Sequence, residues 1–419
     1  MFAVWRWGQS ICFAPGEGSS PYRMFPRKPS MTPGSGGRFP FGYKGGHEDS
    51  SCLDEQVQWA HSARRDLRFS QTPQVVPAKL LRQPEAKMPN YPSSPARRLA
   101  FAAIDRGLLT WRFARLGRRF MRVQGRMPKL ALPETYYDWM QWRKVFDHNP
   151  LFVTLSDKLA AKEFITSRNS DLKVPRVLWV GKGTDAIPKE VLRGNVVVKR
   201  NDGCNRNFFI RAGKYDRDEL AQTIRCWRSE RAYGRKDAEW AYGQIERRIF
   251  VEEMLGNEDE PPVEINIRAG AGKVSYVSLL LHAKTDRESL IYFSRDGKRL
   301  GVEPAPGVTD AELDAIALPE GYQLAVAQAA RLSQEIDYAR FDFYWSSGEL
   351  FAGEITIYPA SGYGIIPTLK LKEDLIENIM RVWDPRNSWF LSTPQRGWRG
   401  VYRRILLDEL DRRGSAVIS

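Results

Sequence analysis

The chain has 419 residues, enough for two or three ordinary domains, and 42% of them are hydrophobic, enough for sizeable cores. The formal net charge of +14 lies within residues 1–130, which hold 22 basic and 8 acidic residues, whereas the remainder holds 42 of each. The charge distribution argues against nucleic-acid binding, which ranks last among the alternative functions. Such binding would depend on the N-terminal segment, which has neither a zinc-finger nor an aromatic RNA-binding motif.

The spacing of the cysteines and histidines argues against several kinds of functional site. The four cysteines form no CxxC pair, which argues against structural zinc and disulfides, and the scattered histidines argue against histidine-based metal or nucleophile chemistry. No run of about 18 apolar residues is present, and the opening stretch MFAVWRWGQSICFAPG makes a poor secretory signal, so we expect a cytoplasmic protein. The residues concerned are Cys12, Cys52, Cys204 and Cys226, with His47, His61, His148 and His282.

Residues 1–95 are rich in Pro, Gly, Ser and Arg and show neither helical nor strand periodicity, so we predict that they are disordered. The folded pattern begins only after Met88. Because Met24, Met31 and Met88 are alternative start positions, a second hypothesis is that the natural protein begins at one of them.

Residues 96–130 predict a basic amphipathic helix. Within residues 97–122 an apolar face lies beside a basic stripe, formed respectively by Leu109, Phe113, Leu116 and Phe120 and by Arg112, Arg115, Arg119 and Arg122. Such a helix suits an anionic lipid surface, which makes peripheral membrane contact one hypothesis. The alternative is that the apolar face docks on the rest of the protein and leaves the arginines solvated.

Residues 131–185 predict lead-in helices and a first strand. Ser156 or Asp157 is expected to cap a helix that ends before Pro175, where the chain enters a strand. Lys158 then lies in the first turn, where the helix dipole disfavours a cation, so it needs a nearby anion or solvent.

Residues 186–256 predict a small lobe. A strand over residues 196–199 runs through a loop containing Gly203 into a second strand over residues 207–210. An amphipathic helix follows over residues 216–233, and a further strand ends on Glu252-Glu253-Met254-Leu255. The hairpin suggests a phosphate-covering loop and the acidic strand end suggests an adenine slot, but each pattern alone is weak evidence for a nucleotide site. Any hairpin with a surface lysine looks similar, and many strands end in acidic residues.

Residues 257–365 predict a larger lobe of strands, with turns near residues 270–272 and 295–298 and a helix over residues 322–336. Two final strands are predicted across the turn Ser346-Ser347-Gly348. Residues 366–419 predict a helical extension with helices over 371–383 and 400–413.

On that last hairpin, Asp342 and Glu354 are placed to point from one face toward a shared point. Two carboxylates suit Mg²⁺, which takes a few hard oxygen ligands and leaves its other positions to water and phosphates. The alternative is that both acids are ordinary solvent-facing strand residues.

The order SDKLAAK, VVVKRNDG, FVEEML, ARFDFYW and GEITIYPASG, over roughly residues 133–365, resembles the ATP-grasp superfamily. It is most similar to the TupA-like branch, which is associated with teichuronopeptide and surface-polysaccharide biosynthesis. The resemblance implies an α+β ATP-grasp fold, in which two lobes with antiparallel sheets enclose ATP.

The resemblance also implies roles for particular residues. Lys158 and Lys199 look like phosphate-binding lysines, with the loop around Gly203 as the phosphate-covering flap. Arg340 looks catalytic, as does Lys199. The implied adenine hinge is Glu252, Glu253, Met254 and Leu255, and the implied Mg²⁺ ligands are Asp342, Glu354 and Thr356.

Two departures from the family pattern stand out. Thr356 takes a place where many ATP-grasp enzymes have asparagine, although its hydroxyl is able to ligate a metal. Asn266, in the stretch VEINI, lies where relatives often have an Asp-Tyr-Lys sequence and lacks that lysine's charge. Two alternatives follow: Lys284 on the next strand substitutes for that lysine in the nucleotide site, or the phosphate site is less positive than in relatives.

The implied reaction is ATP- and Mg²⁺-dependent ligation, in which a small-molecule or sugar-linked carboxylate is activated as an acyl phosphate and captured by an amine. The absence of a conspicuous Ser-His or Cys-His pair fits phosphoryl transfer, which needs positioning and charge neutralisation. The alternatives are a kinase acting on a sugar-type acceptor and a non-catalytic scaffold in a polysaccharide-assembly complex.

Overall fold

The computed structural model describes residues 94–183, 186–231, 233–256, 260–281, 289–303, 309–364, 370–371 and 375–415. These residues all belong to one compact unit of the chain. The predicted disordered segment lies outside them up to residue 93, and Lys284 lies outside them as well.

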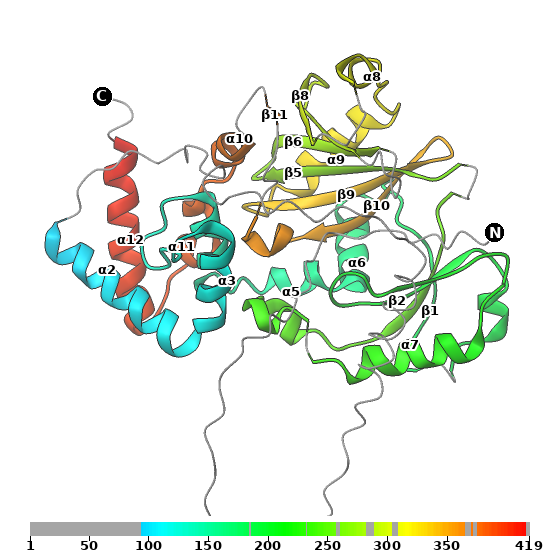
Figure 1. Cartoon of the computed structure of the whole chain (residues 1–419), viewed down its shortest axis with the longest axis horizontal. Helices are drawn as coiled ribbons and strands as arrows, with labels where there is room; N and C mark the ends of the chain where they lie inside the picture. The colour runs from blue at the N-terminus through cyan, green and yellow to red at the C-terminus, as the bar shows by residue number, and fades with distance from the viewer. Residues whose placement is uncertain are drawn as a thin grey trace, which may run out of the picture. The chain divides into compact units, whose positions relative to one another are not determined.

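A small antiparallel sheet has the strand order β1-β4-β2-β3. Its strands β1 and β2 and helix α7 (Arg217–Ser229) are labelled in Figure 1. Helix α7 covers the sheet: the Asp216 side chain accepts hydrogen bonds from the backbone of the first turn, and Leu220, Ile224 and Trp227 are buried in the core beneath the helix. The predicted helix thus ends at Ser229 rather than at residue 233. The strands are β1 (Val177–Gly181), β2 (Val196–Arg200), β3 (Asn207–Ile210) and β4 (Ile249–Glu253).

A larger antiparallel sheet has the order β10-β9-β5-β6-β7-β8-β11. Helix α9 (Tyr322–Leu332) packs against β5 and β6, and the short helix α8 (Asp310–Asp314) precedes it. The two-residue strand β11 lies in the segment for which only helices were predicted. The strands are β5 (Val263–Gly270), β6 (Lys273–Leu281), β7 (Ser289–Phe293), β8 (Arg299–Glu303), β9 (Ala339–Ser346), β10 (Glu349–Thr356) and β11 (Lys370–Leu371).

The two faces of the larger sheet differ in character. Ile265, Ile267, Phe341 and Phe343 are buried in one hydrophobic core together with the apolar side of α9. Because successive strand residues point to opposite faces, the residues between them lie on the other face, and these are largely polar. This alternation places the candidate site on one side of the sheet.

Helices α4 (Tyr136–Phe146), α5 (Leu151–Ser156) and α6 (Lys158–Arg168) connect the N-terminal segment to the sheets. A capping box between Thr135 and Asp138 begins α4. On this helix, buried Arg143 pairs with Asp337 at 2.7 Å, just before β9. Removing either partner would leave a buried charge, so the pair fixes α4 against the large sheet.

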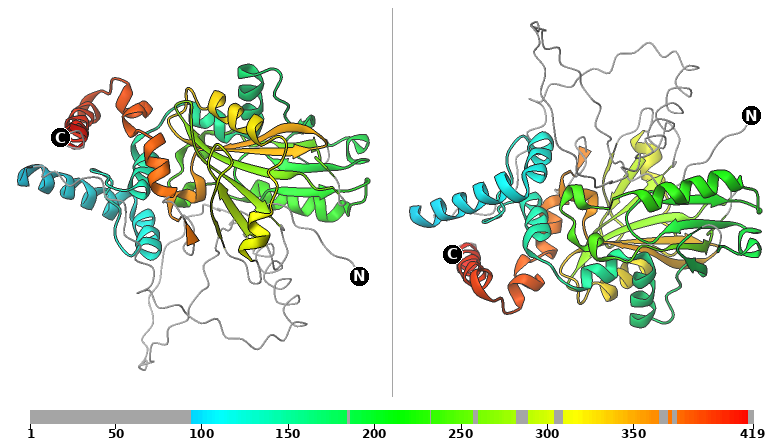
Figure 2. Two further views of the ribbon diagram at one scale, coloured as in Figure 1. Left: turned by 90° about the horizontal axis from the view of Figure 1, so that it is seen from above. Right: turned by 90° about the horizontal axis from the view of Figure 1, so that it is seen from below.

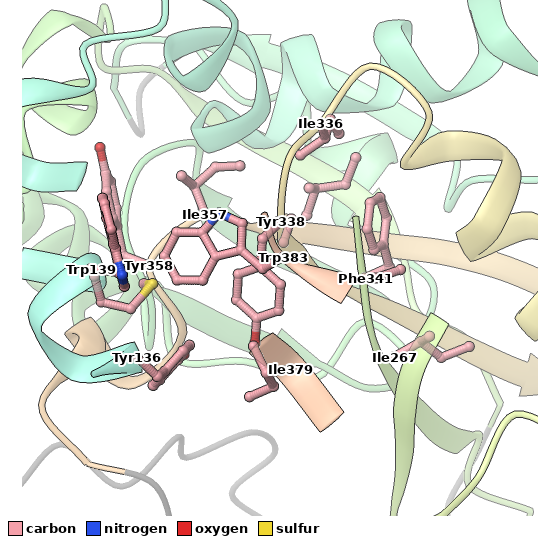
Figure 3. Packing of buried hydrophobic residues seen from close by; sticks show 14 of the residues in the cluster. Tyr136, Trp139, Ile267, Ile336, Tyr338, Phe341, Ile357, Tyr358, Ile379 and Trp383 are labelled. Carbon is pink, nitrogen blue, oxygen red and sulfur yellow. The ribbon is translucent and has the colours of Figure 1, made fainter. Parts of the chain in front are cut away.

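An aromatic cluster lies beside that ion pair, since the Arg143 guanidinium lies 4.4 Å from the centroid of the Trp383 ring. Figure 3 shows the rings of Tyr136, Tyr338 and Trp383 in this cluster. The rings of Tyr338 and Trp383 stack with centroids 5.0 Å apart, and the ring of Tyr136 meets both edge-on. The Trp383 indole donates to Asp337 at 2.9 Å. The cluster therefore joins α4, the start of β9 and the C-terminal region in one core.

The predicted helix over residues 96–130 is broken. It consists of α2 (Pro95–Gly107), a π-helical turn (Leu108–Arg112) and α3 (Ala114–Gln124), because Phe113 leaves helical backbone geometry. Leu109, Leu116 and Phe120 are buried, so the apolar face docks on the rest of the protein. We call residues 94–124 the N-terminal arm.

The C-terminal region contains α10 (Leu375–Val382), α11 (Trp389–Ser392) and α12 (Gly397–Ser415), with α12 close to its predicted bounds. Short 3-10 turns complete the fold at Lys189–Leu192, Arg235–Asp237, Trp240–Gln244, Pro359–Gly362 and Pro385–Asn387. Among the described helices, none has the length and apolar character needed to cross a bilayer. The predicted α+β class with antiparallel sheets is confirmed.

Candidate functional site

The predicted final hairpin is formed by β9 and β10. Ser347 and Gly348, which connect the strands, both have positive φ angles, as a two-residue type I′ turn requires. Past a β-bulge between Ala352 and Glu354, Asp342 lies opposite Glu354 and Arg340 lies opposite Thr356. Since opposite residues share a face, all four predicted side chains lie on the polar face of the sheet.

Arg340 and Asp342 form a bidentate ion pair. The guanidinium donates from Nε to Oδ1 at 2.7 Å and from Nη2 to Oδ2 at 2.6 Å, and Nη2 also lies 3.3 Å from the Thr356 hydroxyl. Burial raises the pKa of Asp342, although Arg340 opposes that shift. Burial also disfavours the charge on Arg340, but Asp342 outweighs it and raises the guanidinium pKa.

Strand β5 brings three more polar residues to the same face, and only Asn266 among them had been considered from the sequence. Asn266 pairs with Asp342 in register, and Arg268 pairs with Arg340. The Arg268 guanidinium donates to Ser278 at 2.7 Å. Burial raises the pKa of Glu264, with the nearby Asp342 charge adding to it. Arg268 thus supplies a cation beside the position where the sequence lacks the expected lysine.

Lys158 connects the two sheets at the flap. Asp157 caps α6, its side chain accepting from the backbone of Leu159 at 2.9 Å, and Lys158 is the first helical residue. The Lys158 ammonium donates to the Gly203 carbonyl in the flap and lies 3.5 Å from Glu354 Oε1. Of the two alternatives for Lys158, a nearby anion or solvent, the structure shows the anion, which is Glu354.

Lys199 pairs with Glu252, a residue predicted to belong to the adenine hinge. Lys162, one turn after Lys158, lies 3.1 Å from the other Glu252 oxygen and donates to the Pro175 carbonyl at 2.9 Å. Burial would raise the pKa of Glu252, but the two lysines outweigh it and lower that pKa. Burial lowers the pKa of Lys162.

The rest of the predicted hinge follows β4. The Glu253 side chain accepts from the Arg176 backbone at 2.9 Å and so turns toward β1. The backbone N–H groups of Glu253 and Met254 donate to the carbonyls of Arg176 and Asn195. The predicted adenine hinge therefore depends on the Leu255 backbone and on carbonyl groups for pairing with a base edge.

The residues expected to hold Mg²⁺ are chemically suited to it. Within the described ranges, no group of three or more His, Cys, Asp or Glu side chains gathers as a metal cage. Asn266 Nδ2 donates to Glu264 at 3.1 Å, which orients the amide and leaves its buried Oδ1 without a hydrogen-bond partner beside Asp342. Two carboxylates with neutral hard oxygens nearby fit Mg²⁺, although Asp342 must share its oxygens with Arg340.

A second polar cluster follows β10, and its two charged members, Glu239 and Lys144, were not indicated by the sequence. The Ser361 hydroxyl donates to Glu239 at 2.6 Å, and buried Lys144 donates to the Ser361 carbonyl at 2.5 Å. Burial raises the pKa of Glu239 to about 7 and lowers that of Lys144 to about 8. Ala360 and Ser361 both adopt left-handed backbone conformations, which cost energy in non-glycine residues and concentrate at functional sites.

A model of the family described as TupA-like ATPgrasp matches residues 138–378. A comparison with curated proteins found no match. The solved structures that resemble the chain include an ADP complex of purK, N5-carboxyaminoimidazole ribonucleotide synthetase (14% identity, 53% of this chain and 50% of that one, TM-score 0.32). Another is the ATP-grasp ligase PsnB complexed with minimal precursor (13% identity, 52% of this chain and 56% of that one, TM-score 0.29). A third is D-alanine–D-alanine ligase from Bacillus anthracis (17% identity, 54% of this chain and 66% of that one, TM-score 0.29). The chain spans between half and two thirds of the length of these structures.

Proposed function

The chain belongs to the TupA-like ATP-grasp family, and we propose that it is an ATP- and Mg²⁺-dependent ligase that joins a carboxylate to an amine. The observation that carries the proposal is the position of Lys158, whose ammonium lies between the flap carbonyl of Gly203 and the Glu354 carboxylate. A cation at this point, between a loop suited to covering phosphates and an acid suited to Mg²⁺, is what phosphoryl transfer requires. We further propose that the reaction belongs to the biosynthesis of a bacterial cell-surface polysaccharide or glycopeptide in the cytoplasm.

In the first half-reaction, a substrate carboxylate oxygen attacks the γ-phosphorus of ATP, and the bond to the β-phosphate oxygen breaks to release ADP. Lys158 and Lys199 would hold the phosphates, and the Gly203 loop would exclude water. Arg340, fixed by Asp342 on the polar face, would stabilise the acyl phosphate by charge-assisted hydrogen bonds.

Asp342, Glu354 and Thr356 are the proposed Mg²⁺ ligands, and the free Asn266 oxygen lies beside them. When bound, Mg²⁺ would neutralise negative charge on the phosphates. The positive charge of Arg268 on the neighbouring strand β5 would also help to neutralise the phosphates. The absence of lysine at position 266 therefore does not leave this face of the sheet without a cation.

In the second half-reaction, the amine nitrogen attacks the acyl carbon and phosphate departs with the bonding electron pair. The amine must also lose a proton. We propose that Ser361, which is partly exposed, borders the amine pocket and passes this proton to the Glu239 carboxylate behind it. The raised pKa of Glu239, about 7, suits a group that accepts a proton near neutrality.

The test is a screen of Mg²⁺-dependent ADP release against panels of uronic acids and amino acids, with the product analysed by mass spectrometry. A condensed product with release of ADP and phosphate is expected. A stable phosphorylated acceptor formed without any amine would replace the ligase with a kinase. Calorimetry that detects no Mg²⁺-dependent ATP binding would instead favour the non-catalytic scaffold.

A further inference from the structure

The N-terminal arm presents a basic surface on the side opposite its buried face. Arg115, Arg118 and Arg122 are exposed and follow one another at helical spacing along α3, whereas Leu116 and Phe120 point inward. Arg106 and Arg112 are exposed as well. None of these five arginines has an ion-pair partner among the residues that the structure describes.

The remaining charges of the arm do not cancel this surface. Its single acidic residue, Asp105, accepts a hydrogen bond from the Ala131 backbone at 2.7 Å and so faces the segment before α4. Arg119 is paired with Asp237 at 2.5 Å, and its guanidinium lies over the ring of Tyr363. Two further contacts join the arm to the body: Arg97 lies 3.9 Å from Glu409 on α12, and Gln124 donates to the Tyr363 carbonyl at 2.6 Å. The arm is therefore held by these residues, Arg119 and its apolar side chains, and no ion pair of the five outward arginines with a described residue adds to the attachment.

Two large apolar side chains of the arm are also uncovered, Trp111 between Arg106 and Arg112, and Leu99 two helical turns before Arg106. Trp111 is 92% exposed and Leu99 is 72% exposed, although both belong to helical turns. In α2 only Phe101 is buried, and the helix runs away from the two sheets (Figure 2). An exposed Trp beside unpaired arginines, with an exposed Leu on the same arm, is typical of a helix that lies in a membrane interface, with arginines at the phosphates and the apolar groups below them.

We propose that the outward surface of the N-terminal arm binds an anionic lipid bilayer. The hydrophobic face predicted from sequence for such a contact is buried against the protein, so the contact uses the opposite side, centred on Trp111, Arg115, Arg118 and Arg122. Charge complementarity selects anionic over neutral lipid, because the neighbouring arginines are left without acidic partners. A nucleic acid would satisfy the same arginines but would give Leu99 no apolar phase to enter. The inference is independent of catalysis.

The experiment is flotation of the full chain with vesicles of phosphatidylcholine alone or of phosphatidylcholine mixed with phosphatidylglycerol. We expect the protein to float only with the anionic vesicles. The triple variant R115Q/R118Q/R122Q should lower the partition coefficient by about a hundredfold, since each arginine near an anionic surface contributes about fivefold. The variant W111A/L99S tests the apolar contribution at unchanged charge and should also weaken partitioning.

The matched control is R217Q/R225Q/R228Q on α7, which removes the same charge from exposed helical positions in the body. It should float like the unmodified protein. The proposal is overturned if the protein does not float with anionic vesicles, or if the α7 triple variant loses as much binding as the arm triple variant. It is also overturned if the arm arginines are needed for binding a single-stranded oligonucleotide while vesicle binding is unaffected by them.

Discussion

Asp342 and Glu354 lie opposite each other across the β9–β10 hairpin only because β10 has a bulge at Gly353, between Ala352 and Glu354. Ser346 pairs with Glu349 at the turn, and an unbroken register would place Gly353 opposite Asp342. The bulge adds one residue to β10, which turns Glu354 to the face that carries Asp342. A Cβ at position 353 would lie 2.3 Å from the Tyr344 ring, so glycine allows this close contact.

The first prediction concerns this bulge. Gly353→Ala should lower the free energy of unfolding by about 1–3 kcal/mol, because the added methyl overlaps the Tyr344 ring. It should also weaken Mg²⁺-dependent ATP binding by moving Glu354. Chemical denaturation and calorimetry measure the two effects. Gly194→Ala is the control, because nothing lies within 4 Å of the added Cβ. Unchanged stability and ATP binding in Gly353→Ala would contradict the role given to the bulge.

Replacing either proposed metal carboxylate should abolish ATP turnover, by at least about a hundredfold, because charge on the phosphates is no longer neutralised. The two variants should differ in stability. Asp342→Asn leaves partly buried Arg340 without its counter-charge and should cost about 3 kcal/mol, whereas Glu354→Gln changes a more exposed group and should cost less. ADP release and thermal unfolding check both outcomes. Full turnover in either variant would refute the metal assignment.

Lys199 and Lys162 both pair with Glu252, but substituting them should have different effects, one mainly on ATP binding and the other mainly on the stability of the fold. Lys199 retains 23% side-chain exposure, so Lys199→Met should weaken ATP binding by about tenfold or more. Lys162 is 9% exposed and donates to the Pro175 carbonyl, so Lys162→Met should mainly destabilise the fold, by about 3 kcal/mol. Each variant is the control for the other, measured by calorimetry and denaturation. Equal losses of ATP affinity would show that Glu252, rather than Lys199, is what the nucleotide site needs.

Glu239 predicts a pH dependence of stability. Its pKa is raised from 4.5 to about 7 in the folded protein, so over this range the folded chain holds a proton that the unfolded chain has lost. The associated stability is fully present below about pH 4.5 and is lost as the pH rises to about 7, a change of about 3 kcal/mol.

Glu239→Gln removes this titration. Relative to the unmodified protein, the variant should therefore gain about 3 kcal/mol between pH 4.5 and pH 7 in denaturation experiments. Lys144 faces the same cluster, but its pKa is lowered to about 8, so its contribution changes at higher pH and in the opposite direction. A pH-independent difference between variant and unmodified protein would contradict the prediction.

Sequence reasoning located the final hairpin and the helix bearing Lys158 because both depend on local patterns. It assigned Asp342 and Glu354 to one face correctly, but simple alternation does not give that result without the bulge. A glycine between acidic and apolar strand residues was the available signal. Lys162 also had a signal, since it lies four residues after Lys158 on the same helix.

Other features had no local signal. Glu239 and Lys144 are far apart in sequence, and only the turn at Ser361 brings them together. The break at Phe113 was missed because periodicity continues across it on both sides, while the π-helical turn shifts the register. Long-range packing, rather than residue preference, decides both cases.

Under the proposed function, the position of Lys158 ties nucleotide affinity to the opening of the loop around Gly203. The same ammonium that is expected to meet a phosphate already donates to the Gly203 carbonyl, so an entering phosphate competes with the loop for one donor. By linkage, whatever weakens the bond between Lys158 and the loop must strengthen binding of the phosphate, and the converse also holds. Under the proposed function, the affinity for ADP would then depend on how strongly the Gly203 carbonyl holds the Lys158 ammonium.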